Sequence, residues 1–136
     1  MASDYGLRKT FREYLVPRGF DAMAVETRGV SVGAPDANYC KRGVEVWVEH
    51  KRIDERYRVT IRPAQVGWIE RRLEHGGRVF VAARTRDELL LYHGNMIREL
   101  QELPVTEVRN LGRWRGRPSA WDWHTIEGLL MDLINL

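Results

Sequence analysis

The stretch Val44–Lys51, which reads VEVWVEHK, carries the strongest strand pattern in the chain. Successive side chains of a strand point to opposite faces, so that residues two apart share a face. One face therefore carries the three valines and His50, and the other carries the two glutamates, Trp47 and Lys51. The pattern predicts a strand with one apolar face directed at a core and one face that presents charged groups.

Apolar spacing, together with glycine and proline positions, predicts the elements on both sides of this strand. Before it we expect a helix over Tyr5–Val16, a strand over Phe20–Glu26 and a turn-rich connection over Gly29–Gly33. After it the strand pattern resumes over Arg56–Ile61, and a helix follows over Pro63–Glu74. Proline is suited to the first turn of that helix, because its missing N–H is not needed there.

Two more strands and two more helices complete the predicted order. The strands are expected over Val79–Ala83 and Glu88–Tyr92, and the helices over Asn95–Leu103 and Thr125–Leu136. Helices and strands thus alternate along the chain, which is typical of an α/β protein with a mixed sheet flanked by helices. A length of 136 residues fits a single domain over residues 1–136.

Composition narrows the class of protein without deciding it. The net charge of +3 and the pI near 9.3 permit a polyanionic partner but do not require one. Cys40 is the only cysteine, which excludes an internal disulfide and a cysteine-based zinc site within one chain. No apolar run reaches membrane-spanning length, and the N-terminus lacks the layout of a secretion signal. We therefore expect a cytoplasmic protein, in the bacterial host cytosol if it is phage-encoded.

Acidic and basic groups on the strand suggest a phosphodiester chemistry. Glu49 and Lys51 are two residues apart, so they project into one space roughly 6 to 7 Å apart along the chain. If the segment that ends at Asp36 pairs with this strand, a second carboxylate enters the same space. Two carboxylates suit Mg²⁺ or Mn²⁺, which can activate a water and withdraw charge from a phosphate. Lys51 can then orient that water or neutralise the transition state.

The order of these residues also resembles a known nuclease superfamily. A glycine turn with Pro35-Asp36 is followed by Glu49-x-Lys51 on an apolar strand and by Gln65 at the start of a helix. This arrangement resembles the PD-(D/E)XK nucleases, and in particular their VRR-NUC (virus-type replication-repair nuclease) family in its stand-alone phage and bacterial form. Further similar segments are residues 43–49 (GVEVWVE), 62–68 (RPAQVGW), 76–81 (GGRVFV) and 89–92 (LLLY).

The resemblance implies a fold and a role for each motif residue. It implies a restriction-endonuclease-like core over about residues 7–94, with a C-terminal Arg/Trp-rich and helical extension over 95–136. Asp36 and Glu49 would be metal ligands, and Lys51 would be the catalytic lysine. Gln65 would position the nucleophile or a phosphate. A metal would also contact the His50 backbone carbonyl and either Glu13 or Glu26, with Glu13 preferred because a helix can present it across the sheet.

Arginines outside the motif are candidates for DNA contact. These are Arg71, Arg72, Arg84, Arg113 and Arg115. Guanidinium groups pair with phosphates in a forked geometry, although a merely solvated surface would carry the same residues.

Four aromatic or imidazole side chains are expected to have structural roles. We expect the His50 ring to be packed or hydrogen-bonded rather than to act as a base, because it lies on the valine face. Trp121 and Trp123 are expected to anchor the C-terminal segment on the core. Trp47 is expected to pack in the core, with stacking on a nucleotide as the alternative.

These observations lead to a function hypothesis with two alternatives. The resemblance implies a Mg²⁺- or Mn²⁺-dependent DNA endonuclease of the DNA-repair type, acting on branched DNA as Holliday-junction resolvases do, as a homodimer. The first alternative is a non-cleaving module on a nuclease fold that binds DNA or a partner protein. A structural or assembly protein is the second alternative. Cleavage in the presence of a divalent metal separates the first hypothesis from the others.

Overall fold

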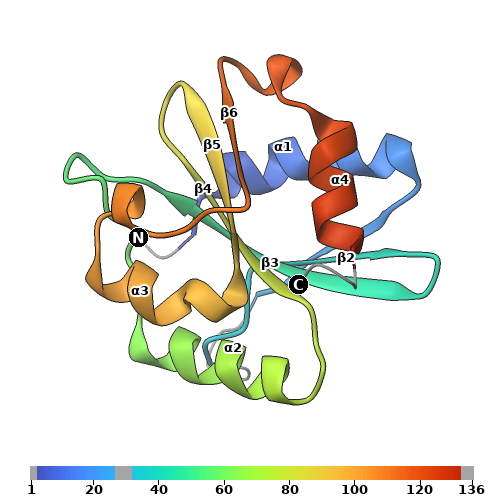
Figure 1. Ribbon diagram of the computed structural model, residues 1–136. Helices are drawn as coiled ribbons and strands as arrows, with labels where there is room; N and C mark the ends of the chain where they lie inside the picture. Colours follow the sequence, from blue (N-terminus) through green and yellow to red (C-terminus); the bar gives the residue numbers. More distant parts are fainter. Residues whose placement is uncertain (1–2, 27–31, 133–136) are drawn as a thin grey trace.

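A twisted six-stranded sheet forms the centre of the computed structural model, which describes residues 3–26 and 32–132 (Figure 1). Its strands lie in chain order, and all neighbours are antiparallel except the parallel pair β3 and β4. The strands are β1 (Asp21–Ala24), β2 (Ala37–Lys41), β3 (Val44–Arg52), β4 (Val79–Arg84), β5 (Glu88–His93) and β6 (Gly112–Arg115). The predicted α/β class with a mixed sheet is confirmed.

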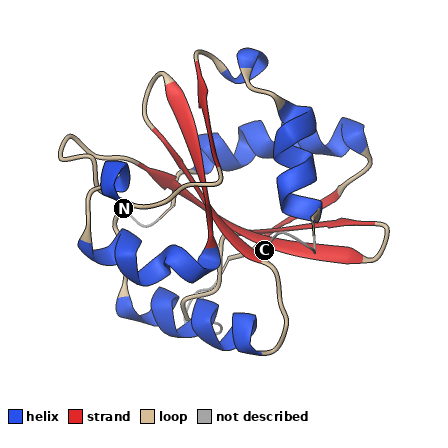
Figure 2. Cartoon of the chain, viewed as in Figure 1, coloured by secondary structure: helices blue, strands red, loops and turns tan. Residues whose placement is uncertain are grey.

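Helices cover both faces of this sheet (Figures 1 and 2). α1 (Tyr5–Leu15) and α4 (Trp123–Met131) enclose one core, and α2 (Pro63–Glu74) and α3 (Ile97–Glu102) enclose the other. Four single turns of 3-10 helix connect these elements: η1 (Val16–Arg18), η2 (Gly94–Met96), η3 (Val105–Glu107) and η4 (Pro118–Ala120). None of the described helices has the length and apolar character needed to cross a membrane.

The predicted alternation of β3 decides which core each of its residues enters. Val46 and Val48 are fully buried against α1 and α4. The opposite face is directed at α2, where Trp47 packs edge-on against Trp68 at 5.2 Å. Trp47 therefore belongs to the second core, as expected. Glu49 follows Trp47 on this α2-facing side of the sheet, which sets the location of the candidate site.

One predicted strand is wrong and two strands were not predicted. Residues 56–61 form a loop, because the Asp54 carboxylate accepts backbone N–H bonds from Arg56 and Arg58 at 2.8 and 3.0 Å. Val59 and Ile61 are nonetheless buried in the core that α2 and α3 enclose, so the alternation of the segment reflected burial rather than pairing. The short strands β2 and β6 carry polar residues at buried or edge positions, which hid them from pattern analysis.

The helix predictions agree with the structure within a few residues. α1 begins after Asp4, whose side chain accepts the Leu7 N–H at 3.0 Å as an N-cap. The third predicted helix is shorter than expected because its first turn is the 3-10 turn η2. The last helix begins two residues earlier than predicted, at Trp123. The end of its predicted range at 133–136 lies outside the described residues, as do residues 29–31 of the predicted connection.

The C-terminal segment is packed onto the same sheet. The Trp123 ring stacks on Tyr14 at 4.7 Å and meets Phe11 edge-on at 5.2 Å. The Arg78 guanidinium donates to the backbone carbonyl oxygens of Leu130 and, at 2.8 Å, Asp132. Trp121 is also buried, so the expectation that the two tryptophans anchor this segment is confirmed.

Candidate active site

Pairing between β2 and β3 brings the first carboxylate to the second. Ala37 lies opposite Val48 in the antiparallel register, so Asp36, just before β2, lies opposite Glu49. The Asp36 backbone N–H donates to Glu49 Oε1 at 3.1 Å, and the His50 backbone N–H donates to Asp36 Oδ1 at 2.9 Å. Each of the two carboxylates thus accepts a backbone N–H from the facing segment. The condition set out from the sequence, that the Asp36 segment pairs with this strand, is met.

Gly33 allows the turn before Asp36 to approach α2. Its φ of +93° lies in the region that favours glycine, and a Cβ atom there would overlap the Ala64 carbonyl. Only a glycine lets the backbone pass this close to the first turn of the helix. The contact holds that turn beside Asp36, and the next helical residue, Gln65, reaches the site.

Lys51 lies at the inner end of the site. Its Nζ is 3.3 Å from Glu49 Oε2 and 3.2 Å from Gln65 Oε1. Gln65 Oε1 also accepts the Arg62 backbone N–H at 3.0 Å, which holds the amide in place at the helix start. The structure therefore brings together all four residues proposed as catalytic, Asp36, Glu49, Lys51 and Gln65.

Burial shifts the pKa values of the two charged groups at the site on β3, Glu49 and Lys51, in opposite directions. Burial and then the neighbouring Asp36 carboxylate raise the pKa of Glu49, although Lys51 opposes that rise. Burial lowers the pKa of Lys51, and the charge of Glu49 opposes the fall. Each group is only 1% exposed, so water screens neither charge effectively. Such perturbed, mutually dependent groups are typical of functional sites.

One buried oxygen at the site lacks a protein partner. Within residues 3–26 and 32–132, Asp36 Oδ2 has no hydrogen-bond donor, and the Arg8 guanidinium approaches it only to 3.9 Å. Leaving a buried acceptor unsatisfied costs about 1–3 kcal/mol. A hard cation between Asp36 and Glu49 would bind this oxygen and would also offset the repulsion between the two carboxylates.

The donor set fits a magnesium or manganese ion. In the described part of the chain, no group of three or more His, Cys, Asp or Glu side chains is arranged to hold a metal. Two carboxylates with open positions are nevertheless what Mg²⁺ accepts, since it retains several waters and takes phosphate oxygens from a substrate. The His50 carbonyl already accepts the Asp4 backbone N–H at 2.7 Å, so a metal would need its second lone pair.

A cavity of about 470 Å³ opens onto the two carboxylates. It is lined by Ser3, Tyr5, Arg8, Val25, Glu26, Ala34, Asp36, Glu49, Arg62 and Gln65. The Ser3 hydroxyl donates to Glu49 Oε2 at 2.8 Å. Ser3, Arg8 and Arg62 were not singled out from the sequence, because only the fold brings the N-terminal segment and the α2 cap to this cavity.

The structure separates the two glutamates proposed as a third ligand. Glu26 lines the cavity. Glu13 lies on the exposed side of α1, where its carboxylate is 3.9 Å from Lys9 and outside the cavity. The prediction that the helix presents Glu13 across the sheet is wrong, because that face of α1 points to solvent. The placement therefore favours Glu26.

The arginines proposed for DNA contact lie away from the cavity. Arg84 pairs with Asp4 at 2.7 Å, and Arg113 pairs with Glu88 at 2.8 Å. Arg72 stacks on Trp68, 4.4 Å from the ring centre, while Arg71 and Arg115 are exposed. None of these five residues is among those that line the cavity in the described chain. Their role in DNA binding stays a prediction.

His50 belongs to the structural support of the site. Its ring is fully buried, with Nδ1 2.9 Å from Asp36 Oδ1 and Nε2 3.2 Å from the Tyr39 hydroxyl. The expectation of a packed, hydrogen-bonded histidine is confirmed. The ring and the backbone N–H of His50 both contact Oδ1 of Asp36, and neither contacts Oδ2.

Comparison with known proteins identifies the fold. No protein-family model matches the sequence, and no curated protein matches it. Among solved structures, the chain is similar to Hjc of Archaeoglobus fulgidus, a Holliday junction resolvase from an archaeal hyperthermophile. The TM-score is 0.54 at 18% identity, over 68% of this chain and 78% of that one. A likeness at this identity shows the fold alone, which is the restriction-endonuclease-like fold, as predicted.

Proposed function

We propose that this protein is a Mg²⁺- or Mn²⁺-dependent endonuclease that hydrolyses phosphodiester bonds in branched DNA. The observation that carries the proposal is the buried Asp36 Oδ2 without a donor, in a residue that lies next to Glu49 and lines the same cavity as Arg8 and Arg62. The fold it shares with a Holliday junction resolvase supports the choice of branched DNA. The VRR-NUC family is the finer assignment that the motif spacing supports.

Each site residue has a defined task in this proposal. Asp36 and Glu49 would hold the metal, which supplies an activated water and withdraws charge from the phosphate when bound. Lys51, held by Glu49 and Gln65, offers its ammonium group to the attacking water or to the charge that develops on the phosphate. Arg8 and Arg62 present positive charge to the phosphate at the cavity mouth.

Further proposals concern the unit that acts and its location. We treat residues 1–136 as one nuclease domain in which 95–136 extend the core. A homodimer would place two such sites around a twofold axis, as cutting two opposed strands requires. A DNA substrate and the absence of a spanning helix among the described residues are consistent with action in the cytoplasm.

Cleavage of defined DNA tests the function directly. Incubation with a four-way junction, a flap, a single strand and a blunt duplex is expected to give metal-dependent cleavage, strongest on the branched DNAs. Retained cleavage in EDTA would contradict the metal mechanism. Binding without cleavage in any metal would instead support the non-cleaving DNA-binding alternative, and its dependence on salt would identify phosphate contacts.

Metal binding is expected to stabilise the folded protein. With a dissociation constant near 1 mM, 10 mM Mn²⁺ adds about 1.4 kcal/mol, which raises Tm by about 4 °C. Asp36→Asn should remove most of this shift, because it deletes a ligand charge while its amide oxygen can still accept the His50 N–H. Asp87→Asn, at an exposed turn, is the matched control and should retain it. Equal shifts in both variants, measured by differential scanning fluorimetry, would exclude Asp36 as a ligand.

A further inference from the structure

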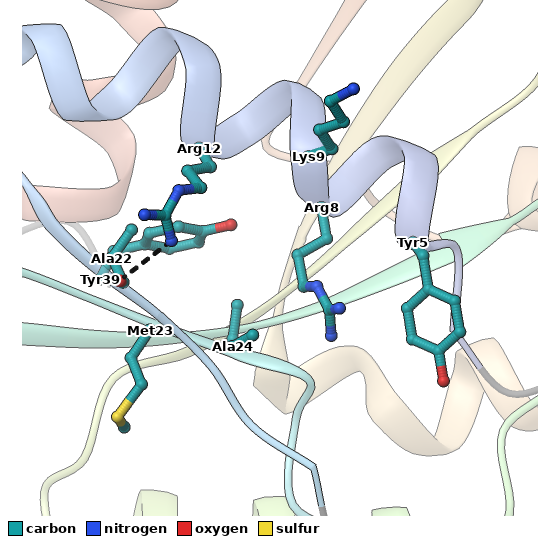
Figure 3. Close-up of a pocket in the computed structure, with 9 residues that line it drawn as sticks. Tyr5, Arg8, Lys9, Arg12, Ala22, Met23, Ala24 and Tyr39 are labelled. Carbon is teal, nitrogen blue, oxygen red and sulfur yellow. Dashed lines mark hydrogen bonds between the residues drawn. The ribbon is translucent and has the colours of Figure 1, made fainter.

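A second cavity lies beside the candidate active site, between α1 and the edge of the sheet (Figure 3). Its volume is about 380 Å³, near the lower end of the range of roughly 300–1,000 Å³ for small-ligand sites. Tyr5 and Arg8 line both cavities. The two cavities therefore adjoin at these two residues, and we call the second cavity the α1 groove.

The α1 groove has a cationic side and an apolar floor. Arg8, Lys9 and Arg12 line it from the helix, and no Asp or Glu is among its described lining residues. The Arg12 guanidinium is held by the Ala22 carbonyl at 3.5 Å (Figure 3). The Arg8 guanidinium donates to the Asp36 carbonyl at 3.4 Å. Both guanidinium groups are thus placed over the strands, and the Arg8 guanidinium also lies 3.9 Å from Asp36 Oδ2.

The floor and ends of the groove suit a flat aromatic ring. β1 and β2 contribute the small side chains Ala22, Ala24 and Ala37. Tyr5 and Met23 border the groove and are 58% and 55% exposed, although both are large apolar residues. The Arg8 guanidinium lies 4.7 Å from the centre of the Tyr5 ring, so aromatic and cationic surfaces meet at the point where the two cavities join.

We propose that the α1 groove binds one unpaired nucleotide of the strand that is cleaved, next to the scissile phosphate. Its base would lie on the alanine floor beside Tyr5, and its phosphate would contact Arg8 and Arg12. A paired base has both faces stacked within the duplex, so only an unpaired nucleotide can offer its face to this floor. The inference rests on the proposed nuclease function, because it takes the position of the scissile phosphate from the carboxylate site.

Binding in EDTA tests the groove without requiring cleavage. Fluorescence anisotropy would compare a blunt duplex with the same duplex carrying a short single-stranded extension, at either end polarity. Of the two extended DNAs, the wild-type protein is expected to bind the preferred one about tenfold more tightly than the blunt duplex. This is the gain expected from the stacking of one base. Equal affinity for the blunt and extended DNAs would overturn the proposal.

Two variants and one control locate the effect. Ala24→Leu fills the floor and keeps every charge, and Arg12→Gln removes one rim cation; each should reduce the preference to about twofold. For the extended DNA only, Arg12→Gln should also reduce the slope of the logarithm of the binding constant against the logarithm of the salt concentration by about 0.7. Arg109→Gln removes an exposed cation outside the groove and should leave the preference unchanged. The proposal fails if Arg12→Gln and Arg109→Gln weaken binding of both DNAs by the same factor.

These experiments distinguish a failure of the groove proposal from a failure of the proposed nuclease function. A preference for unpaired DNA that Ala24→Leu removes, in a protein that cleaves nothing, would overturn the nuclease function and support the groove. Metal-dependent cleavage without any such preference would overturn the groove alone. Circular dichroism and thermal unfolding of Ala24→Leu check that the variant still folds as a whole. Arg12→Gln tests the groove independently, because its change lies on α1 and not on the edge strand.

Discussion

Replacing Glu49 with Gln is expected to reduce DNA cleavage by about a thousandfold while DNA binding in EDTA persists. The amide has nearly the shape of the carboxylate, and its oxygen can still accept the Asp36 backbone N–H that Glu49 Oε1 accepts at 3.1 Å. The fold is therefore expected to survive, although the buried Lys51 ammonium loses the Glu49 charge at 3.3 Å and stability falls. What is lost is the negative charge opposite Asp36, which the proposed metal requires.

Glu45→Gln is the matched control for this variant. Glu45 lies on β3, on the same face as Glu49, but it is exposed and remote from the cavity. Its replacement should leave the cleavage rate within about twofold, since an exposed charge at that distance is screened. Single-turnover cleavage of a branched DNA provides the measurement. Comparable losses in the two variants would show that β3 acts only as a structural strand.

Replacing Lys51 with Met is expected to reduce cleavage by a factor of about 10²–10³ and to destabilise the fold at neutral pH. Met fills much of the volume of the lysine stem, but Glu49 then keeps a buried charge without its cation at 3.3 Å. Removing one partner of a buried ion pair costs about 3 kcal/mol. Urea denaturation in EDTA measures the second effect independently of cleavage.

The destabilisation of Lys51→Met should depend on pH with a defined sign. The Lys51 charge opposes the rise in the pKa of Glu49, so the variant raises that pKa further above its ordinary value of 4.5. The loss in the free energy of unfolding is therefore full above the raised pKa, where Glu49 is ionised. It disappears as the pH falls toward 4.5 and Glu49 becomes protonated. Arg52→Met, which removes the exposed neighbouring cation on the opposite face of β3, should show no such change. A destabilisation that stays constant between pH 7 and 4.5 would contradict the assigned pairing.

The fold elements followed from local patterns where one face was buried. The alternation of residues 44–51 placed Glu49 and Lys51 together, because strand geometry separates the two faces whatever the rest of the chain does. Gly76 and Pro63 likewise marked the ends of α2, since both act through local backbone geometry. The loop at residues 56–61 shows the limit of this approach: alternation reports burial, and a capping aspartate can bury the same residues without a strand.

Residues distant in sequence could be joined only by the tertiary structure. The pairing register of β2 decided that Asp36 faces Glu49, and no local pattern marked β2 as a strand. The direction in which α1 crosses the sheet placed Arg8 at the carboxylates and left Glu13 in solvent.

The sequence by itself thus determined the paired charges of β3, the apolar faces and most helices, all of which depend on spacing along one segment. Only the tertiary structure decided the second carboxylate's position, its oxygen without a donor, the cationic lining and the neighbouring α1 groove. Those features depend on contacts between segments that are far apart in the chain. The physical reason is that strand register and helix packing are set by the whole core, not by the residues that meet at the site.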